Sequence, residues 1–408
     1  MSARRDISHF RVLDWNFLHE DSKHFLHNFS WYPSRFIPII PAHLIQALSK
    51  ENETVLDPFC GSGTAIIEAL KLKRNAIGID INPIGTFIAQ VKARIMTGKI
   101  LQIGKLVEFN LYLQSKLQDV GSNDVTLFNR KGLQLFMSIK EIPNFEENSD
   151  WYHPSTLAML ADIYRYIESE LAGLTKDICK IFFISILMNS SGYPIDKNYA
   201  YFADNVKPKG DKACKNAYKL YQHKLDKLIT DYAVFDRRMI SSNTFHIYRA
   251  DARTLRSLFH DKVDLIVTSP PYLNVTDYTT SFRLAYLWYD FLNHDQMIEV
   301  KKQEIGARWR RKQGSKLTDY INSMDNALTE MAACLKRERY LCLIIGESKK
   351  YSETINNIII DILTKKLNHE LVETFTRAIS KKFFMHPNGG GVQTEEILIF
   401  RKRGMTKW

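Results

Sequence analysis

The stretch ETVLDPFCGSGTAIIEALKLKRNAIGID, residues 53–80, decides the fold. Two short apolar runs, at 53–57 and 75–80, each end in an acidic residue, and the segment between them has the apolar spacing of an amphipathic helix. Strand, glycine-rich turn, helix and strand, in this order, form the repeating unit of a parallel sheet with helices on its faces. The stretch therefore predicts a doubly wound α/β fold.

This pattern stops after the first unit and returns much later in the chain. Residues from about 97 to 244 read as long amphipathic or apolar helices with almost no strands. Apolar runs then predict five more strands, at 244–251, 262–269, 339–347, 371–379 and 394–402. We therefore expect one mostly parallel, seven-stranded sheet formed by residues 1–96 and 245–408, with a helical insertion at 97–244.

Composition limits the class of protein. The chain has 408 residues, 45% of them hydrophobic, and no apolar run is long enough for a membrane span. The N-terminus lacks the apolar core of a signal peptide, which favours the cytoplasm. The five cysteines are scattered without a C-x-x-C pair, so we expect neither a disulfide framework nor a metal site. The net charge of +11 favours polyanionic partners.

The glycine-rich turn predicts a nucleoside site. Gly61 and Gly63 lack a Cβ, so the backbone can turn tightly and a ligand can approach closely. Asp80 ends the second strand, where a carboxylate can accept hydrogen bonds from both hydroxyls of a ribose. No lysine follows the glycines as it does in phosphate-binding P-loops. The structural alternative is that the glycines only tighten the corner between strand and helix.

A second motif, SPPY at 269–272, follows the predicted strand at 262–269. Each proline fixes its own φ and removes a backbone donor, and Pro270 also restricts Ser269. The Ser269 hydroxyl and the Pro270 carbonyl can therefore act as fixed acceptors beside the ring of Tyr272. The alternative is a proline-stiffened exit from a strand.

Together, DPFCGSGT (57–64) and TSPPY (268–272) resemble the cofactor loop and catalytic motif of the DNA amino-methyltransferases. The resemblance covers roughly residues 24–95 and 245–402. It implies a Rossmann-like enzyme that moves a methyl group from S-adenosylmethionine to an exocyclic amine of a base flipped out of double-stranded DNA. Serine before the prolines resembles the N4-cytosine enzymes more than the N6-adenine enzymes. The resemblance also implies a prokaryotic, nucleoid-associated protein of a restriction–modification system, with a cognate restriction endonuclease as functional partner.

The resemblance assigns roles to individual residues. The catalytic residues are Ser269, Pro270, Pro271 and Tyr272, with Tyr272 stacking on the flipped base. The segment HNFSWYPSRFIP (27–38) resembles one that closes over the methionine end of the cofactor, although it can equally be an arm packed on the sheet. The family resemblance as a whole implies that the cofactor-binding residues are Ser34, Arg35, Asp57, Phe59, Gly61, Gly63, Thr64, Asp80, Ile81, Asp251 and Ala252.

DNA contacts are expected from three further segments. The basic run 307–316 supplies Arg308, Arg310, Arg311 and Lys312, which can bind phosphates or form a solvated surface. Tyr199 lies in an aromatic loop of the insertion. Asn388 lies in a glycine-rich turn that can enter a groove or only close a hairpin. We expect target recognition to be shared between the 97–244 insertion and the connection at 273–335.

Other functions remain open from the sequence. An N6-adenine enzyme has the same architecture, and an RNA guanine-N2 methyltransferase can share both motifs. A DNA-binding protein that has lost cofactor binding is disfavoured by the intact Asp57, Asp80 and Ser269. Methylation at cytosine C5 is disfavoured because it needs a cysteine nucleophile, and the Pro-Cys motif of those enzymes is missing from the sequence.

Overall fold

Residues 54–80 form the predicted strand–helix–strand unit in the computed structural model. β1 (Thr54–Asp57) runs parallel to β2 (Asn75–Asp80), and α3 (Thr64–Lys71) crosses between them. The structure describes residues 7–17, 25–28, 32–33, 37–120, 142–191, 207–208, 212–307, 317–346, 352–379 and 394–404.

β1 lies in a seven-stranded sheet of order β3-β2-β1-β4-β5-β7-β6. Neighbouring strands from β3 to β5 are parallel, whereas β7 is antiparallel to both β5 and β6. The predicted fold class and strands are confirmed, although β5 begins earlier than expected. The other strands are β3 (Phe245–Arg249), β4 (Val263–Thr268), β5 (Leu335–Gly346), β6 (His369–Ala378) and β7 (Thr394–Lys402).

Both faces of the sheet are buried, which explains the continuous apolar runs of its strands. Side chains alternate along β4, so Leu265 and Val267 join one core and Ile266 joins the other. The first core contains residues of α2 (Ile39–Leu48), α3 and α4 (Pro83–Met96). The second contains residues of α11 (Arg256–Phe259), α15 (Leu317–Cys334), α16 (Ser352–Asp361) and the π-helical turn Ile362–Lys366.

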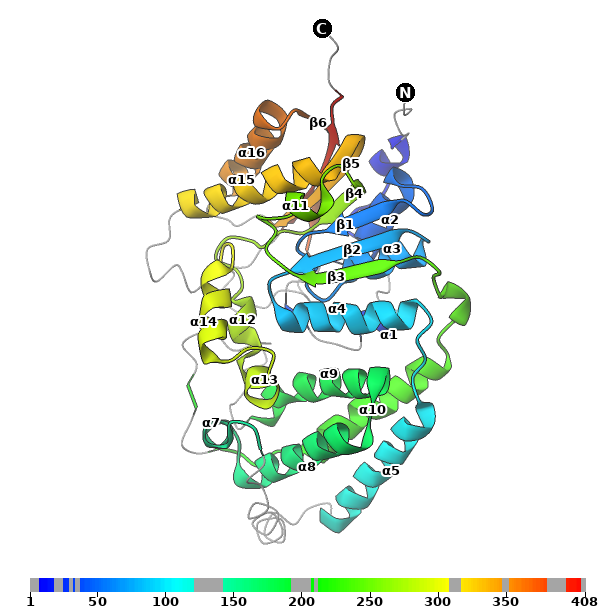
Figure 1. The fold of residues 1–408 in the computed structure, drawn as a ribbon, viewed down its shortest axis with the longest axis vertical. Coiled ribbons are helices and arrows are strands. Elements are labelled where there is room, and N and C mark those ends of the chain that lie inside the picture. The colour runs from blue at the N-terminus through cyan, green and yellow to red at the C-terminus, as the bar shows by residue number, and fades with distance from the viewer. Residues whose placement is uncertain are drawn as a thin grey trace.

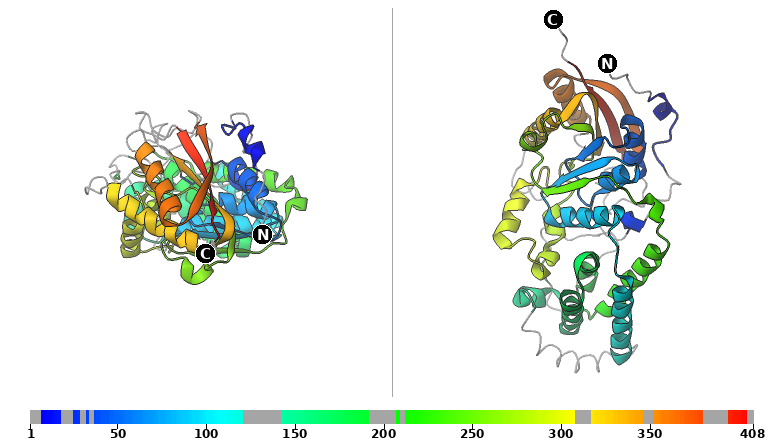
Figure 2. Two further views of the ribbon diagram at one scale, coloured as in Figure 1. Left: turned by 90° about the horizontal axis from the view of Figure 1, so that it is seen from above. Right: turned by 45° about the vertical axis from the view of Figure 1, so that its right-hand side comes forward.

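The insertion between β2 and β3 forms a layer of helices, as predicted for its described part. This layer lies beyond α4, at the end of the molecule opposite both chain termini (Figures 1 and 2). A short 3₁₀ turn, Arg237–Met239, precedes β3. The helices are α5 (Ile103–Val120), α7 (Phe145–Trp151), α8 (Pro154–Glu170), α9 (Gly173–Ser190) and α10 (Ala217–Ala233).

The helical layer shares an apolar core with the rest of the molecule. Trp288, at the end of α13 (Arg283–Trp288), is fully buried, and its ring centroid lies 5.0 Å from that of Phe183 in α9. Arg94 of α4 pairs with Asp177 of α9 at 2.5 Å. Because the buried cluster runs through both parts without a break, the layer is held firmly against the sheet domain.

The connection after β4 lies beside the carboxyl ends of the parallel strands. It contains α12 (Tyr278–Ser281), α13 and α14 (His294–Gln303). Asn293 and Gln296 form a reciprocal capping box that fixes the start of α14.

The N-terminal segment covers an edge of the sheet. It contains the 3₁₀ turn Ser8–Arg11 and the short α1 (Phe25–Asn28). Trp15 stacks on Phe375 of β6, with ring centroids 5.1 Å apart, which protects the edge strand. Among the described residues, no helix is long and apolar enough to cross a membrane.

Candidate active site

A cleft opens at the carboxyl ends of β1, β2 and β4. The connections from β1 lead to one side of the sheet and those around β4 to the other, so their loops diverge here and leave room for a ligand. The cleft contains about 800 Å³ of empty space, counted to its open mouth. The predicted site residues that line it are Phe59, Gly61, Thr64, Asp80, Ile81, Asp251, Ala252, Ser269 and Pro271.

The glycine-rich turn joins β1 to α3 and presents its backbone to Asp80. Gly61 has a φ of +46°, in the left-handed region that favours glycine, and its N–H donates to Asp80 Oδ2 at 2.8 Å. A Cβ at Gly61 would lie 2.8 Å from the ring of Tyr32. The turn can therefore close over Asp80 only because this position has no side chain.

Gly63 packs against a neighbouring helix. It has a φ of +83° and does not line the cleft. A Cβ here would lie 2.9 Å from the Cβ of Ala89 in α4. Gly63 therefore allows α3 and α4 to pack closely, and its predicted role in cofactor binding stays a prediction.

Asp80 ends β2 as a fixed acceptor. Its Oδ2 accepts from Gly61 and its Oδ1 accepts from the Asn82 N–H at 2.8 Å. Burial raises its pKa to about 6, and the two backbone hydrogen bonds oppose that shift. Each carboxylate oxygen still has a lone pair for a ligand hydroxyl.

Asp57 is placed below the cleft rather than in it. Its Oδ1 accepts hydrogen bonds from the Thr268 hydroxyl at 2.6 Å and from the Phe59 N–H at 3.1 Å. Burial raises its pKa to about 7. The carboxyl group therefore ties the end of β1 to the end of β4, two strands whose residues are 211 positions apart in the chain. Its predicted role in cofactor binding stays a prediction.

The SPPY motif follows β4, and only part of the motif lines the cleft. Ser269 and Pro271 line the cleft, whereas Pro270 and Tyr272 do not. The Tyr272 hydroxyl lies 3.0 Å from Ser269 Oγ and 3.1 Å from Glu395 Oε1 of β7. The phenol is therefore held from the side of the sheet, and stacking of its ring on a base stays a prediction.

Asp251 lies in the cleft but is already engaged. Both of its oxygens accept from the Arg253 guanidinium, at 2.9 and 2.5 Å for the shortest pairs. Arg253 also donates to the Gln303 carbonyl at 3.2 Å. Through Arg253, Asp251 thus connects the turn after β3 to the end of α14, and its predicted role in cofactor binding stays a prediction.

The remaining wall comes from residues that sequence reasoning missed, notably Tyr32, Tyr278 and Glu304. Glu304 is buried, and its Oε1 accepts from the Thr279 N–H at 2.5 Å and from the Thr279 hydroxyl at 2.6 Å. Burial raises its pKa to about 8, so the carboxyl is largely protonated at neutral pH. No sequence pattern marks Glu304, because its burial depends on how α12 and α14 fold over the strand ends.

Several predicted residues lie outside the described part of the chain. These are the cofactor-closing pair Ser34 and Arg35, and the DNA-binding candidates Tyr199, Arg308, Arg310, Arg311, Lys312 and Asn388.

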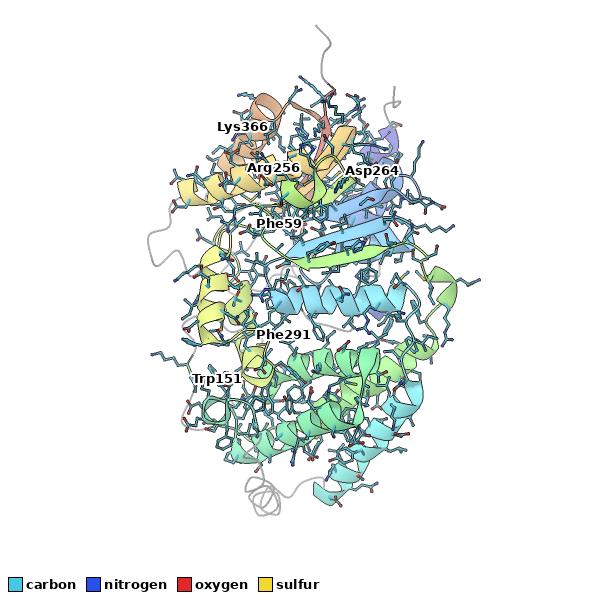
Figure 3. The ribbon with its side chains drawn as sticks, viewed as in Figure 1. Phe59, Trp151, Arg256, Asp264, Phe291 and Lys366 are labelled. Carbon is cyan, nitrogen blue, oxygen red and sulfur yellow. The ribbon has the colours of Figure 1, made fainter. Side chains whose placement is uncertain are left out.

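The cleft fits S-adenosylmethionine. Asp80 offers acceptors for a ribose, and Phe59 and Ile81 offer apolar surface for an adenine. Phe59 lies near the strand ends on the side of the sheet where α12 and α14 are found (Figure 3). The Ser62 hydroxyl, in the same turn, is buried and has no hydrogen-bond partner within the described part of the chain. Glu304 Oε2 is likewise buried without a partner among these residues. A polar ligand that reaches into the cleft would satisfy such groups.

Comparison with known proteins agrees with this site. A family model described as DNA methylase matches residues 4–87. Type II methyltransferase M.MjaII of Methanocaldococcus jannaschii is 22% identical over 423 aligned positions, covering 84% of this chain and 77% of that protein. M.BsoBI of Geobacillus stearothermophilus is 26% identical, over 73% of this chain and 59% of that protein. M.MvaI of Kocuria varians is 21% identical, over 96% of this chain and 94% of that protein.

The matched family model begins before the glycine-rich turn and includes it together with Asp80. The relatives also align beyond that segment, over most of the chain. With the two motifs meeting at one cleft, these matches show that the chain is similar to DNA methyltransferases, and they support an S-adenosylmethionine-dependent DNA amino-methyltransferase.

Proposed function

We propose that this protein transfers a methyl group from S-adenosylmethionine to the exocyclic N4 of cytosine at a specific site in double-stranded DNA. The observation that carries the proposal is that Ser269 lines the same cleft as Gly61 and Asp80. An acceptor for a base amine and an acceptor for a ribose thus face one space. The serine form of the catalytic motif supports cytosine N4 over adenine N6.

When bound, S-adenosylmethionine supplies a methyl group on a positively charged sulfur. In the proposed complex Asp80 accepts from the ribose hydroxyls, while Phe59 and Ile81 pack against the adenine. Tyr32 lines the same cleft, and its ring packs against Gly61. These contacts hold the donor in one orientation, and orientation supplies a large part of the rate enhancement of a transfer reaction.

Ser269 and Pro270 would act on the nucleophile. The lone pair of a cytosine amine is conjugated with the ring and is therefore a weak nucleophile. Hydrogen bonds from the amine to Ser269 Oγ and to the Pro270 carbonyl favour a pyramidal nitrogen that directs its lone pair at the methyl group. The nitrogen forms the new bond to carbon while the electrons of the broken carbon–sulfur bond stay on sulfur. The positively charged nitrogen then loses a proton to water.

DNA binding is proposed to use the helical layer and the connection after β4. These two parts lie next to each other, because α13 packs on α9 through Trp288 and Phe183. The connection also brings α12 and α14 to the mouth of the cleft. A base can reach Ser269 only after it has left the duplex.

The test is nucleoside analysis of DNA after incubation with the protein and labelled S-adenosylmethionine. We expect N4-methylcytosine, at positions that sequencing of the modified DNA will map. N6-methyladenine as the sole product would overturn the choice of base. Label in tRNA but not in DNA would instead favour an RNA guanine-N2 enzyme. The Ser269→Ala variant, which keeps the cofactor residues, is the matched control for contaminating activity.

A further inference from the structure

A chain of hydrogen bonds leads from the cleft into the sheet. Ser269 Oγ lies 3.0 Å from the Tyr272 hydroxyl, which lies 3.1 Å from Glu395 Oε1. Glu395 Oε2 accepts from Arg377 Nη1 at 2.8 Å, and the two side chains are cross-strand partners on β7 and β6. Only 5% of the Arg377 side chain and 9% of the Glu395 side chain are exposed. This series of hydrogen bonds therefore begins at a residue that lines the cleft and ends in a buried ion pair.

The chemistry of these groups fixes the direction of the hydrogen bonds. A carboxylate only accepts hydrogen bonds, and a phenol has a single hydrogen to donate. Arg377 favours the ionised form of Glu395, against the burial that raises the pKa of this carboxyl. Tyr272 keeps its proton, because burial and the nearby Glu395 raise its pKa well above the ordinary value. The tyrosine hydrogen is therefore given to Glu395 Oε1 at 3.1 Å rather than to the neutral Ile344 carbonyl, which lies farther away at 3.5 Å.

This direction determines what Ser269 presents to the cleft. With its hydrogen used on Glu395, Tyr272 can only accept at its contact with Ser269. The Ser269 hydroxyl hydrogen must then point at Tyr272, which leaves the lone pairs of Ser269 Oγ facing the cleft. Lone pairs match the hydrogens of an exocyclic amine. The same lone pairs repel a carbonyl oxygen at this place, such as O4 of uracil or thymine.

We propose that Glu395 is a positioning residue that acts through Tyr272 to hold Ser269 as an acceptor, so that the site takes an amine-bearing base and rejects a keto base. The proposal deepens the proposed amine methylation and rests on it. It applies to a cytosine or an adenine target alike, because both present an exocyclic amine.

The structure offers a set of matched variants. Glu395→Gln replaces the carboxylate with an amide that can donate to the tyrosine oxygen, so the direction of the chain is no longer fixed. Tyr272→Phe removes the link but keeps the ion pair, and it tests the proposal even if Glu395→Gln fails to fold because Arg377 loses its counter-charge. Glu396→Gln is the control, because the neighbouring carboxylate binds Asn356 at 2.7 Å, on the other face of the sheet.

Methyl transfer to unmodified genomic DNA and calorimetric binding of S-adenosylmethionine provide the two readouts. We expect kcat to fall about tenfold or more in Glu395→Gln and in Tyr272→Phe, with the cofactor Kd within about twofold of wild type. The double variant should lose no more than Tyr272→Phe alone, because Glu395 acts through the hydroxyl. Losses that multiply in the double variant, or a Tyr272→Phe variant with wild-type kcat, would overturn the proposal.

A third readout separates positioning from a structural role. Once the modified site is mapped, the Kd of duplexes with the natural base or its keto analogue (uracil for cytosine, hypoxanthine for adenine) at the target position can be compared by fluorescence anisotropy, because a keto base has no exocyclic amine to receive a methyl group. The preference for the amine-bearing base should shrink in Glu395→Gln and stay unchanged in Glu396→Gln. An unchanged preference in an active Glu395→Gln would refute the proposal. Absence of methyl transfer by the wild-type protein would instead refute the proposed function.

Discussion

Two walls of the cleft are held by different kinds of contact. The cofactor wall, formed by Gly61, Asp80 and Asn82, is held by backbone N–H groups that lie 19 and 2 positions from Asp80 in the chain. The target wall, formed by Ser269 and Pro271, is held through the adjoining Tyr272 by side chains and carbonyls from distant strands. Tyr272 reaches Glu395, 123 positions away, and approaches the Ile344 carbonyl, 72 positions away.

The two walls therefore depend on different parts of the molecule for their structure. Local backbone contacts form as soon as the strand–helix–strand unit folds, so the cofactor wall tolerates changes elsewhere in the molecule. The target wall depends on the register of β7 against β5, in which Glu395 lies opposite Gly346. A shift of one residue would place Glu396 on the face that Glu395 now occupies. The target wall is therefore assembled only in the complete sheet.

The largest effect is expected from Ser269→Ala, which removes the acceptor on the target wall. We expect kcat for DNA methylation to fall on the order of a hundredfold, as for the loss of one preorganised hydrogen-bonding group at a reaction centre. The cofactor Kd, measured by calorimetry, should not change, because the cofactor wall is held separately. A weakened cofactor Kd would show that the two walls are coupled.

The converse change is Asp80→Ala on the cofactor wall. Loss of the carboxylate should raise the Kd of S-adenosylmethionine about tenfold to a hundredfold, because two charge-assisted hydrogen bonds disappear. DNA binding, measured by fluorescence anisotropy, should be largely kept. Equal losses of cofactor and DNA affinity would contradict the separate construction of the two walls.

Replacing Tyr272 with alanine sharpens the comparison within the target wall. Turnover should fall further than the roughly tenfold loss expected for Tyr272→Phe, because the alanine variant also removes the ring that is predicted to stack on the flipped base. Cofactor affinity should be kept in both variants. Equal rates for the alanine and phenylalanine variants would assign the whole effect to the hydroxyl and none to stacking.

The smallest expected effect concerns stability and the Glu304 carboxyl, which lies between the two walls. Its pKa of about 8 exceeds the ordinary value near 4, so the folded state binds the proton more tightly than the unfolded state does. Its contribution to stability is therefore complete at low pH and is lost as the pH rises through 8. The free energy of unfolding, from urea titrations without cofactor, should fall less steeply between pH 5 and 8 in Glu304→Gln than in wild type. The pH slopes of the free energy of unfolding of the two proteins should differ by at most roughly 1.4 kcal/mol per pH unit. Parallel pH profiles would show that Glu304 is ionised in the folded protein.

Much of the cofactor wall could be predicted, because its signals are local. The glycines, the strand patterns and the acid at the end of β2 all lie within one short segment, and their backbone geometry follows from residue type. The protein partners of these residues could not be predicted. Gly63 meets Ala89, and Asp57 meets Thr268, both through packing of separate elements. Neither contact leaves a pattern in the sequence.

The sequence by itself determined the seven strands, the place of the helical insertion and the two motifs that meet at the cleft. These features depend on hydrophobic periodicity and on the backbone preferences of glycine and proline, which act over a few residues. The tertiary structure alone decided the partners of Tyr272, the burial of Glu304 and the closeness of Glu395 to the catalytic motif. Such contacts depend on strand order and register, which bring together residues with no relation along the chain.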